Sequence, residues 1–197
     1  MKIKLDIQRK YKQIQGVIDF GNARTLLLKG NNGTGKSTCL DYIKQNTLNI
    51  FEKTTVAYCS QSPQPALPGF TVQHLLNLSL EFSRDKNVTQ NLQNDLIHMF
   101  EFKDKLKTEI RQLSGGENQL LKLITTLCLN ADFYFLDEPF QFLDESKSTA
   151  LMNYLIKLKS HKKLFIIEHK THWPSDFFDK TYILKSQTEF QTEIYEL

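Results

Sequence analysis

Short apolar runs bounded by turn residues recur along the chain, and they predict buried strands. They lie at 24–29, 54–59, 132–137 and 163–168, and the last predicted strand, K-T-Y-I-L-K, is at 180–185. Between them, apolar residues recur at helical spacing, as Leu120, Ile124 and Leu127 do. Because strand and helix patterns alternate, we expect βαβ units and an α/β fold with a mostly parallel sheet.

The N-terminal residues alternate apolar Ile3, Leu5 and Ile7 with polar residues, which predicts a strand. We expect this strand to form an antiparallel β edge of the sheet. A continuous apolar segment of the secretory type is absent, so this region does not resemble a signal peptide. No stretch approaches the roughly 20 apolar residues of a membrane span. We therefore expect a cytoplasmic protein that reaches a membrane only through a partner.

A helical insert interrupts the α/β pattern. Pro63, Pro65, Pro68 and Gly69 break the chain, and two helical patterns without strands follow them, at 72–76 and 92–100. We therefore expect one domain over 1–197, with a core formed by 1–62 and 117–197 and a small helical subdomain at 63–116.

Charge and cysteine content exclude several classes of protein. The formal net charge is only +3, and a surface that follows nucleic-acid phosphates needs clustered Lys and Arg, so we expect no direct nucleic-acid binding. The three cysteines, Cys39, Cys59 and Cys128, are far apart and lack C-x-x-C spacing. This pattern favours buried, reduced thiols over disulfides or a zinc site.

The strand at 24–29 runs directly into G-N-N-G-T-G-K-S-T, which a helical pattern follows. This is the sequence and the context of a phosphate-binding loop. Glycines at 30, 33 and 35 let backbone N–H groups face phosphate oxygens, and the helix N-terminus adds a favourable dipole. Lys36 is expected to reach the β- and γ-phosphates, and Ser37 to bind Mg²⁺. The predicted nucleotide-binding residues are Gly30, Asn31, Asn32, Gly33, Thr34, Gly35, Lys36, Ser37 and Thr38.

Two adjacent carboxylates end the apolar strand F-Y-F-L-D-E-P. Successive side chains of a strand point in opposite directions, so Asp137 can face Mg²⁺ while Glu138 points toward the γ-phosphate and the attacking water. Such a pair alone is often a solvated strand end. Downstream of a phosphate loop, it predicts a metal ligand and a catalytic base.

The segment L-S-G-G-E-N-Q at 113–119 opens a helix. Ser114 with Glu117 three residues later matches a capping box, which is a complete structural explanation of those two residues. Capping does not require Gly115 and Gly116, which cost helix stability and permit close approach of the backbone to an anion. The glycines therefore favour a binding role.

The phosphate loop, then L-S-G-G-E, then the apolar strand ending in D-E-P follow one another along the chain. In this order they resemble the nucleotide-binding domain of ABC ATPases, which has a P-loop NTPase core. The resemblance covers nearly the whole chain and implies binding and hydrolysis of ATP with Mg²⁺. It also implies a head-to-tail dimer with a second ABC ATPase domain, identical or related. In such a dimer, Ser114, Gly115 and Gly116 of one subunit cover the ATP of the other. In transporters of this family, the dimer drives an integral membrane permease, which implies a peripheral position at the cytoplasmic face.

Smaller matches to the family assign further residues. Gln61 resembles the Q-loop glutamine, which contacts Mg²⁺ or the water, and His169 resembles the switch histidine at the γ-phosphate; with Lys36 and Glu138 they form the predicted catalytic set. Asp144 resembles the D-loop aspartate at the dimer interface and also fits a helix N-cap. Tyr11 is expected either to stack on adenine or to be a core residue.

The sequence also departs from the family pattern. Phe140, Gln141 and Phe142 replace the usual small polar residues before Leu-Asp, so we expect the coupling of the dimer to differ there. We expect no C-terminal regulatory domain. A second class of function stays open, that of a soluble ABC ATPase acting on a non-membrane assembly, such as a cluster-assembly scaffold. Only 78 positions separate Lys36 from Ser114, which leaves no room for the long coiled coil of repair and chromosome members.

Overall fold

The protein is built on one eight-stranded sheet with the order β1-β2-β8-β7-β3-β6-β5-β4. The structure is a computed structural model that describes residues 2–9, 12–50, 54–61, 68–169, 173–188 and 190–197. Its strands are β1 (Lys2–Arg9), β2 (Lys12–Asp19), β3 (Thr25–Gly30), β4 (Val56–Cys59), β5 (Phe133–Asp137), β6 (Lys163–Ile167), β7 (Lys180–Ser186) and β8 (Gln191–Glu196). β4, β5, β6, β3 and β7 are parallel neighbours, whereas β1–β2 and β7–β8 are antiparallel pairs. The predicted α/β class, with a mostly parallel sheet and antiparallel N-terminal strands, is confirmed.

The last predicted strand is not the last strand of the sheet. β8 follows it and pairs with β7 on one side and, in parallel, with β2 on the other. Its run Q-T-E-I-Y-E buries Thr192 and Ile194 and exposes the residues between them. Half of the side chains of a strand can be polar when one face of the sheet is solvated, so the apolar content of β8 gave little signal.

Helices cover both faces of the central strands. They are α1 (Lys36–Ile50), α2 (Val72–Glu81), α3 (Lys86–Met99), α4 (Gly115–Leu127) and α5 (Glu145–Leu158), with short 3-10 turns η1 (Lys103–Lys105) and η2 (Ile110–Gln112). Phe133 and Phe135 of β5 pack on the side of α1, and Tyr134 and Leu136 pack on the side of α4 and α5. This alternation buries both faces of β5 and holds its carboxyl end in a fixed place.

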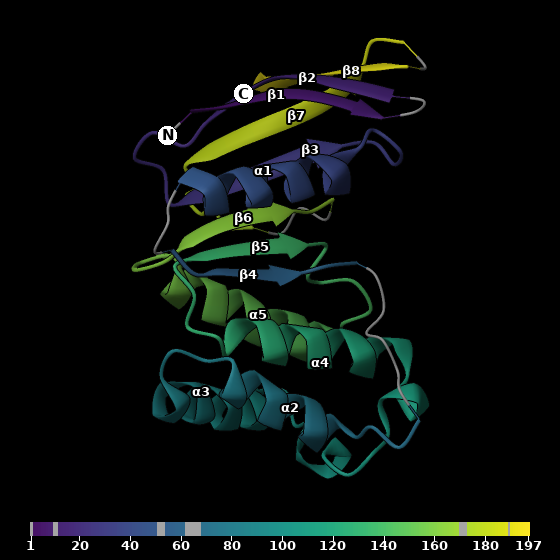
Figure 1. The fold of residues 1–197 in the computed structure, drawn as a ribbon, viewed down its shortest axis with the longest axis vertical. Coiled ribbons are helices and arrows are strands. Elements are labelled where there is room, and N and C mark those ends of the chain that lie inside the picture. The colour runs from purple at the N-terminus through teal and green to yellow at the C-terminus, as the bar shows by residue number, and fades with distance from the viewer. Residues whose placement is uncertain (1, 10–11, 51–53, 62–67, 170–172, 189) are drawn as a thin grey trace.

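In the described residues between β4 and α4 the elements are helical, and α2 and α3 lie against α4 away from the sheet (Figure 1). Thr71 and Asp85 cap these helices through their side chains. Within the described ranges, Cys39, Cys59 and Cys128 are buried free thiols, as predicted.

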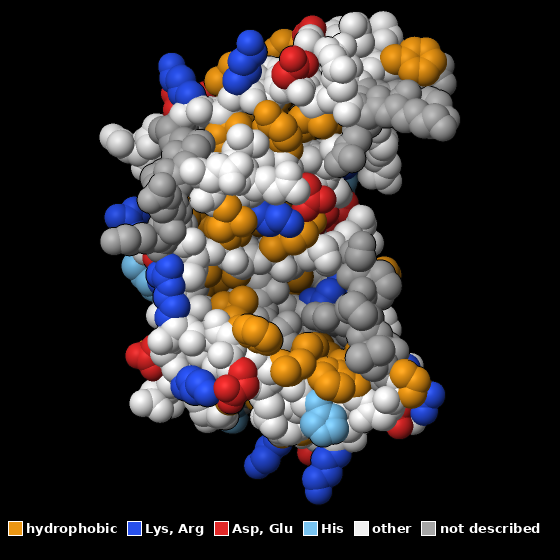
Figure 2. All heavy atoms as spheres, in the orientation of Figure 1, with side chains coloured by type: hydrophobic (Ala, Val, Ile, Leu, Met, Phe, Trp, Pro, Cys, Tyr) orange, Lys and Arg blue, Asp and Glu red, His pale blue; other side chains and the backbone are white. Residues whose placement is uncertain are grey.

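The carboxyl ends of the parallel strands meet at one edge of the sheet, toward which the arrowheads of β4, β5 and β6 point (Figure 1). The molecule is hollowed along this edge (Figure 2). Open α/β sheets bind ligands at the carboxyl ends of their strands, so a ligand site is expected here. Among the helices that the structure describes, none has the length and apolar character needed to cross a membrane.

Candidate functional site

The loop between β3 and α1 folds around a buried lysine. Nζ of Lys36 donates to the carbonyl oxygens of Gly30 at 3.0 Å and Asn31 at 3.1 Å, and the Lys36 side chain is nearly buried. Gly33 and Gly35 have φ angles of +77° and +95°, which L side chains rarely adopt. A Cβ on Gly35 would lie 2.6 Å from Cδ1 of Ile14, so the end of that side chain would have to shift to make room for it.

Lys36 lies close to the carboxylates at the end of β5. Burial lowers the pKa of its ammonium group, and the charges of Glu138 and Asp137 oppose this shift. A cation held between a glycine loop, a helix N-terminus and two carboxylates has the arrangement of a triphosphate site.

Asp137 is buried behind the loop, with 2% of its surface exposed. Burial raises the pKa of its carboxyl group, and a hydrogen bond from Ser37 opposes this shift. Its Oδ2 atom has no hydrogen-bond partner among the described residues. A buried carboxylate oxygen without a protein donor, beside a serine hydroxyl, is a hard oxygen donor set that fits Mg²⁺.

Glu138 is held between two residues that are distant in sequence. Its Oε2 atom accepts a hydrogen bond from Nε2 of Gln61 at 2.9 Å, and its Oε1 atom lies 3.1 Å from Nε2 of His169. The backbone of Glu138 has a φ of +49°, a strained conformation that persists where the surroundings impose it and that often marks functional sites. The fold therefore brings together three of the four predicted catalytic residues, and Lys36 lies in the same cavity.

This cavity has a volume of about 850 Å³. It is lined by the predicted residues Asn32, Gly33, Gly35, Lys36, Ser37, Thr38, Gln61, Glu138 and His169, and by Ile14 and Gln141, which the sequence did not predict. Gly30, Asn31 and Thr34 do not line it. They hold the loop together instead, since the Thr34 hydroxyl donates to the Asn31 carbonyl at 2.8 Å.

Ile14 is the wall residue that sequence analysis missed. Ile14 lies in β2 and is buried against Gly35. In the sequence it belongs to a short alternating run, which predicts a strand but does not indicate a binding site. Gln141 follows Glu138 by three residues and was noted only as a departure from the family pattern. Tyr11, proposed to stack on adenine, lies outside the described residues.

The segment 113–119 is built as a capped helix start. The Ser114 hydroxyl accepts from the Glu117 amide at 3.3 Å, and the Glu117 carboxylate accepts from the Ser114 amide at 2.8 Å. Gly115 has open space where a Cβ would lie, whereas a Cβ on Gly116 would lie 2.9 Å from the carbonyl oxygen of Phe142. Packing against the 140–144 loop therefore gives Gly116 a structural reason to be glycine, whereas no packing reason of this kind applies to Gly115. These residues do not line the cavity of their own chain.

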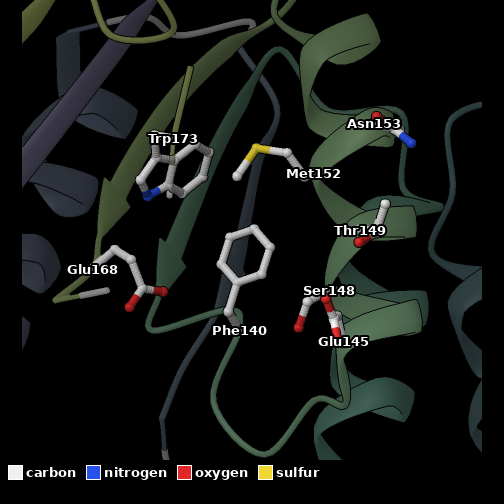
Figure 3. Close-up of a pocket in the computed structure, with 8 residues that line it drawn as sticks. All are labelled: Phe140, Glu145, Ser148, Thr149, Met152, Asn153, Glu168 and Trp173. Atoms are coloured by element: carbon white, nitrogen blue, oxygen red, sulfur yellow. The ribbon is translucent and has the colours of Figure 1, made fainter. Parts of the chain in front are cut away.

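The 140–144 loop connects the end of β5 to α5. Asp144 caps α5 by accepting from the Lys147 amide at 2.8 Å, as its alternative interpretation predicted. The Phe140 ring packs edge-on against Trp173, with centroids 5.2 Å apart, and Figure 3 shows both rings and Met152 facing one hollow of about 340 Å³. Phe142 is 68% exposed, with a φ of +63°. The two phenylalanines of this loop thus differ: Phe140 packs against Trp173, whereas the Phe142 ring is exposed.

The two glycines give a matched test of this packing. Gly116→Ala is expected to lower the free energy of unfolding by about 1–3 kcal/mol, because its methyl group overlaps the Phe142 carbonyl. Gly115→Ala is expected to raise it by up to about 1 kcal/mol, because alanine favours the helix and meets no neighbour. Urea unfolding of both variants without nucleotide measures the difference. Equal effects would show that Gly116 is not packed against this loop.

The chain is similar to known ATP-binding cassette proteins. The family model described as "ABC transporter" matches residues 17–141. The translation initiation factor RLI1 of Saccharomyces cerevisiae is 28% identical over 179 residues, which are 88% of this chain and 28% of that protein. The manganese transport system ATP-binding protein MntB of Bacillus subtilis is 42% identical over 77 residues, 39% of this chain and 31% of that protein.

The solved structure titled "Structure of ATP binding subunit of ABC transporter" has a TM-score of 0.79 at 19% identity. It covers 96% of this chain and 86% of that one, and it supports the fold alone. The chain spans less than a third of the length of the two curated relatives, so their activities as whole proteins do not transfer directly.

Proposed function

The chain belongs to the ABC transporter family, whose cassettes hydrolyse ATP, and we propose that it is the ATP-binding subunit that drives a separate membrane permease. The observation that carries the catalytic part is the carboxylate of Glu138, held between Gln61 and His169 beside the phosphate loop. A carboxylate with fixed orientation at the end of a strand is suited to receive a proton from water that attacks the γ-phosphate.

Six residues in and beside the cavity have parts in the proposed mechanism. Lys36 exchanges its bonds to loop carbonyls for the β- and γ-phosphates when ATP enters, and its charge then offsets the negative charge that develops during transfer. Gln61 and His169 keep Glu138 in place, and Glu138 orients the water and takes its proton. Ser37, Asp137 and Gln61 would hold Mg²⁺, which neutralises phosphate charge when bound.

A second copy or a relative would complete the site. Ser114 and Gly115 are exposed at the start of α4 and do not line the cavity of their own chain. In a head-to-tail dimer they would cover the ATP of the other subunit, with the amide groups of a helix N-terminus facing its phosphates. ATP would then join the two subunits, and hydrolysis would release them.

A surface hollow in the helical region favours a membrane permease as the partner. Pro68, Phe70, His74 and Leu78 line a hollow at the start of α2. Hydrophobic side chains gather over this half of the molecule (Figure 2), and Leu78 is 42% exposed. An apolar hollow at the start of α2 is a fitting place for a helix of a membrane partner, and it would hold the chain at the cytoplasmic face.

A second function, that of an ABC ATPase acting on a soluble assembly, also has an observation in its favour. The alignment with the translation initiation factor RLI1 covers 88% of this chain at 28% identity. The alignment with a manganese transport system ATP-binding protein, MntB of Listeria monocytogenes, covers 80% at 27% identity, so coverage does not distinguish the two functions.

The two functions differ in what accompanies the ATP-bound protein. The Glu138→Gln variant should retain ATP and hold its partner, so it is incubated with detergent-solubilised membranes and, separately, with the soluble fraction, in Mg-ATP. Recovery of a multi-span membrane protein that is lost with Lys36→Ala supports the permease. Recovery of soluble proteins alone would replace that proposal with the second function.

A further inference from the structure

A lysine is buried in the apolar middle of α4. Lys122 is 6% exposed, and its neighbours Leu121 and Leu123 are fully buried. An ammonium group in such a place is costly unless hydrogen bonds compensate for the lost water. The acceptors of the Lys122 ammonium group therefore indicate the role of this residue.

The Lys122 ammonium donates to the loop that carries Gln61. Nζ lies 3.0 Å from the carbonyl oxygen of Ser60 and 3.4 Å from that of Gln61. These residues follow β4, the last strand of the sheet order, which pairs with β5 only. Since the loop has left the strand ladder there, Lys122 supplies donors that no neighbouring strand provides in the described part of the sheet.

A second residue on the same face of α4 contacts the other side of the site. Nε2 of Gln119, one turn before Lys122, donates to the carbonyl oxygen of Glu138 at 3.5 Å. Gln61 and Glu138 are in turn joined through their side chains. The helix that begins at Ser114 is thus connected to both members of the pair that holds the proposed base.

We infer that Lys122 is a positioning residue. It couples the position of α4 to the Gln61–Glu138 pair and thereby links the two ATP sites of the dimer. This inference rests on the proposed function, because Ser114 at the start of α4 would cover the ATP of the partner. When that ATP draws the helix inward, Lys122 carries the displacement to the loop of Gln61 in its own chain. Each subunit would then sense whether the opposite site is filled.

Replacement of Lys122 by methionine tests this coupling. Methionine has a similar length and fills the same apolar space, but it cannot donate to the two carbonyl oxygens. We expect kcat to fall about 10- to 100-fold through misplacement of Gln61, with KM for ATP changed by less than about twofold. The Hill coefficient for ATP is expected to fall toward one.

Thr126→Val is the matched control. Thr126 lies on α4, is buried and donates to a carbonyl oxygen of β4, that of Tyr58 at 3.5 Å, but it lies one turn farther from the site. Its loss is expected to leave kcat and the Hill coefficient unchanged. Circular dichroism and thermal unfolding of both variants verify that each one folds.

A double-variant cycle with Gln61 separates positioning from general damage. If Lys122 acts through Gln61, Lys122→Met lowers kcat much less in a Gln61→Ala background than in the wild type. An equal loss in both backgrounds overturns the inference, and so does a Lys122→Met enzyme with wild-type kcat and cooperativity. Either result leaves the proposed function standing. A wild-type chain that neither hydrolyses ATP nor joins a second cassette would overturn the proposed function and the inference together.

Discussion

Replacement of Glu138 by glutamine is expected to lower kcat for ATP hydrolysis about 10²- to 10⁴-fold, the range of positioned general bases, while ATP binding is retained. Glutamine has the same shape, so the phosphate loop and Mg²⁺ ligands stay in place. The amide cannot accept the proton of the attacking water. Its NH₂ group is a donor, so only one of its two terminal atoms can accept a hydrogen bond, whereas both oxygens of the carboxylate can.

Phosphate release under saturating Mg-ATP measures this loss, and gel filtration with ATP measures the dimer. The variant is expected to form an ATP-dependent dimer that the wild type forms only transiently. Glu81→Gln provides the control, because Glu81 is an exposed carboxylate paired with Lys86, on the helix α2 outside the cavity. A Glu138→Gln variant that hydrolyses ATP within about threefold of the wild type would assign the base to another residue.

The nucleotide site was largely predictable because its chemistry is encoded in short segments. Lys36, Ser37 and the loop glycines lie within nine residues, and Asp137 and Glu138 are adjacent. Phosphate binding needs backbone amides at a helix start, and this need fixes residue types and spacing together. Gln61 and His169 were found only through their order relative to these segments, yet both reach the same carboxylate.

Contacts between distant segments were not predictable in this way. The close approach of Gly116 to the Phe142 carbonyl depends on how α4 lies against the 140–144 loop, and no sequence pattern shows that arrangement. Lys122 appears in the sequence as one polar residue among leucines, with no pattern to show that it reaches the carbonyl oxygens of Ser60 and Gln61. Strand β8 was missed because its buried side chains, Thr192 and Ile194, are only two.

Asp137→Asn is expected to abolish the effect of Mg²⁺ and at the same time to stabilise the ligand-free protein. Burial raises the pKa of Asp137 in the folded state, so its ionised form is disfavoured there relative to the unfolded chain. The resulting loss of stability is absent below the pKa that Asp137 has in the unfolded chain. It develops as the pH rises from there through the higher pKa that Asp137 has in the folded protein. Asparagine has no charge to bury, so the Tm of the ligand-free variant at pH 7 is expected to exceed that of the wild type by about 2–4 °C.

The same change removes an anionic ligand of Mg²⁺, so hydrolysis is expected to fall about 10²- to 10³-fold, and Mg-ATP is expected to raise the Tm no more than ATP with a chelator. Thermal unfolding between pH 4 and 8 tests the sign, because the stabilisation should shrink toward pH 4. Asp132→Asn is the control of opposite sign. Burial would raise the pKa of Asp132, but hydrogen bonds from Thr55 outweigh it and lower that pKa, so this variant should lose stability at pH 7 and retain activity. If Asp137→Asn is instead less stable than the wild type at pH 7, the buried charge of Asp137 does not destabilise the ligand-free protein.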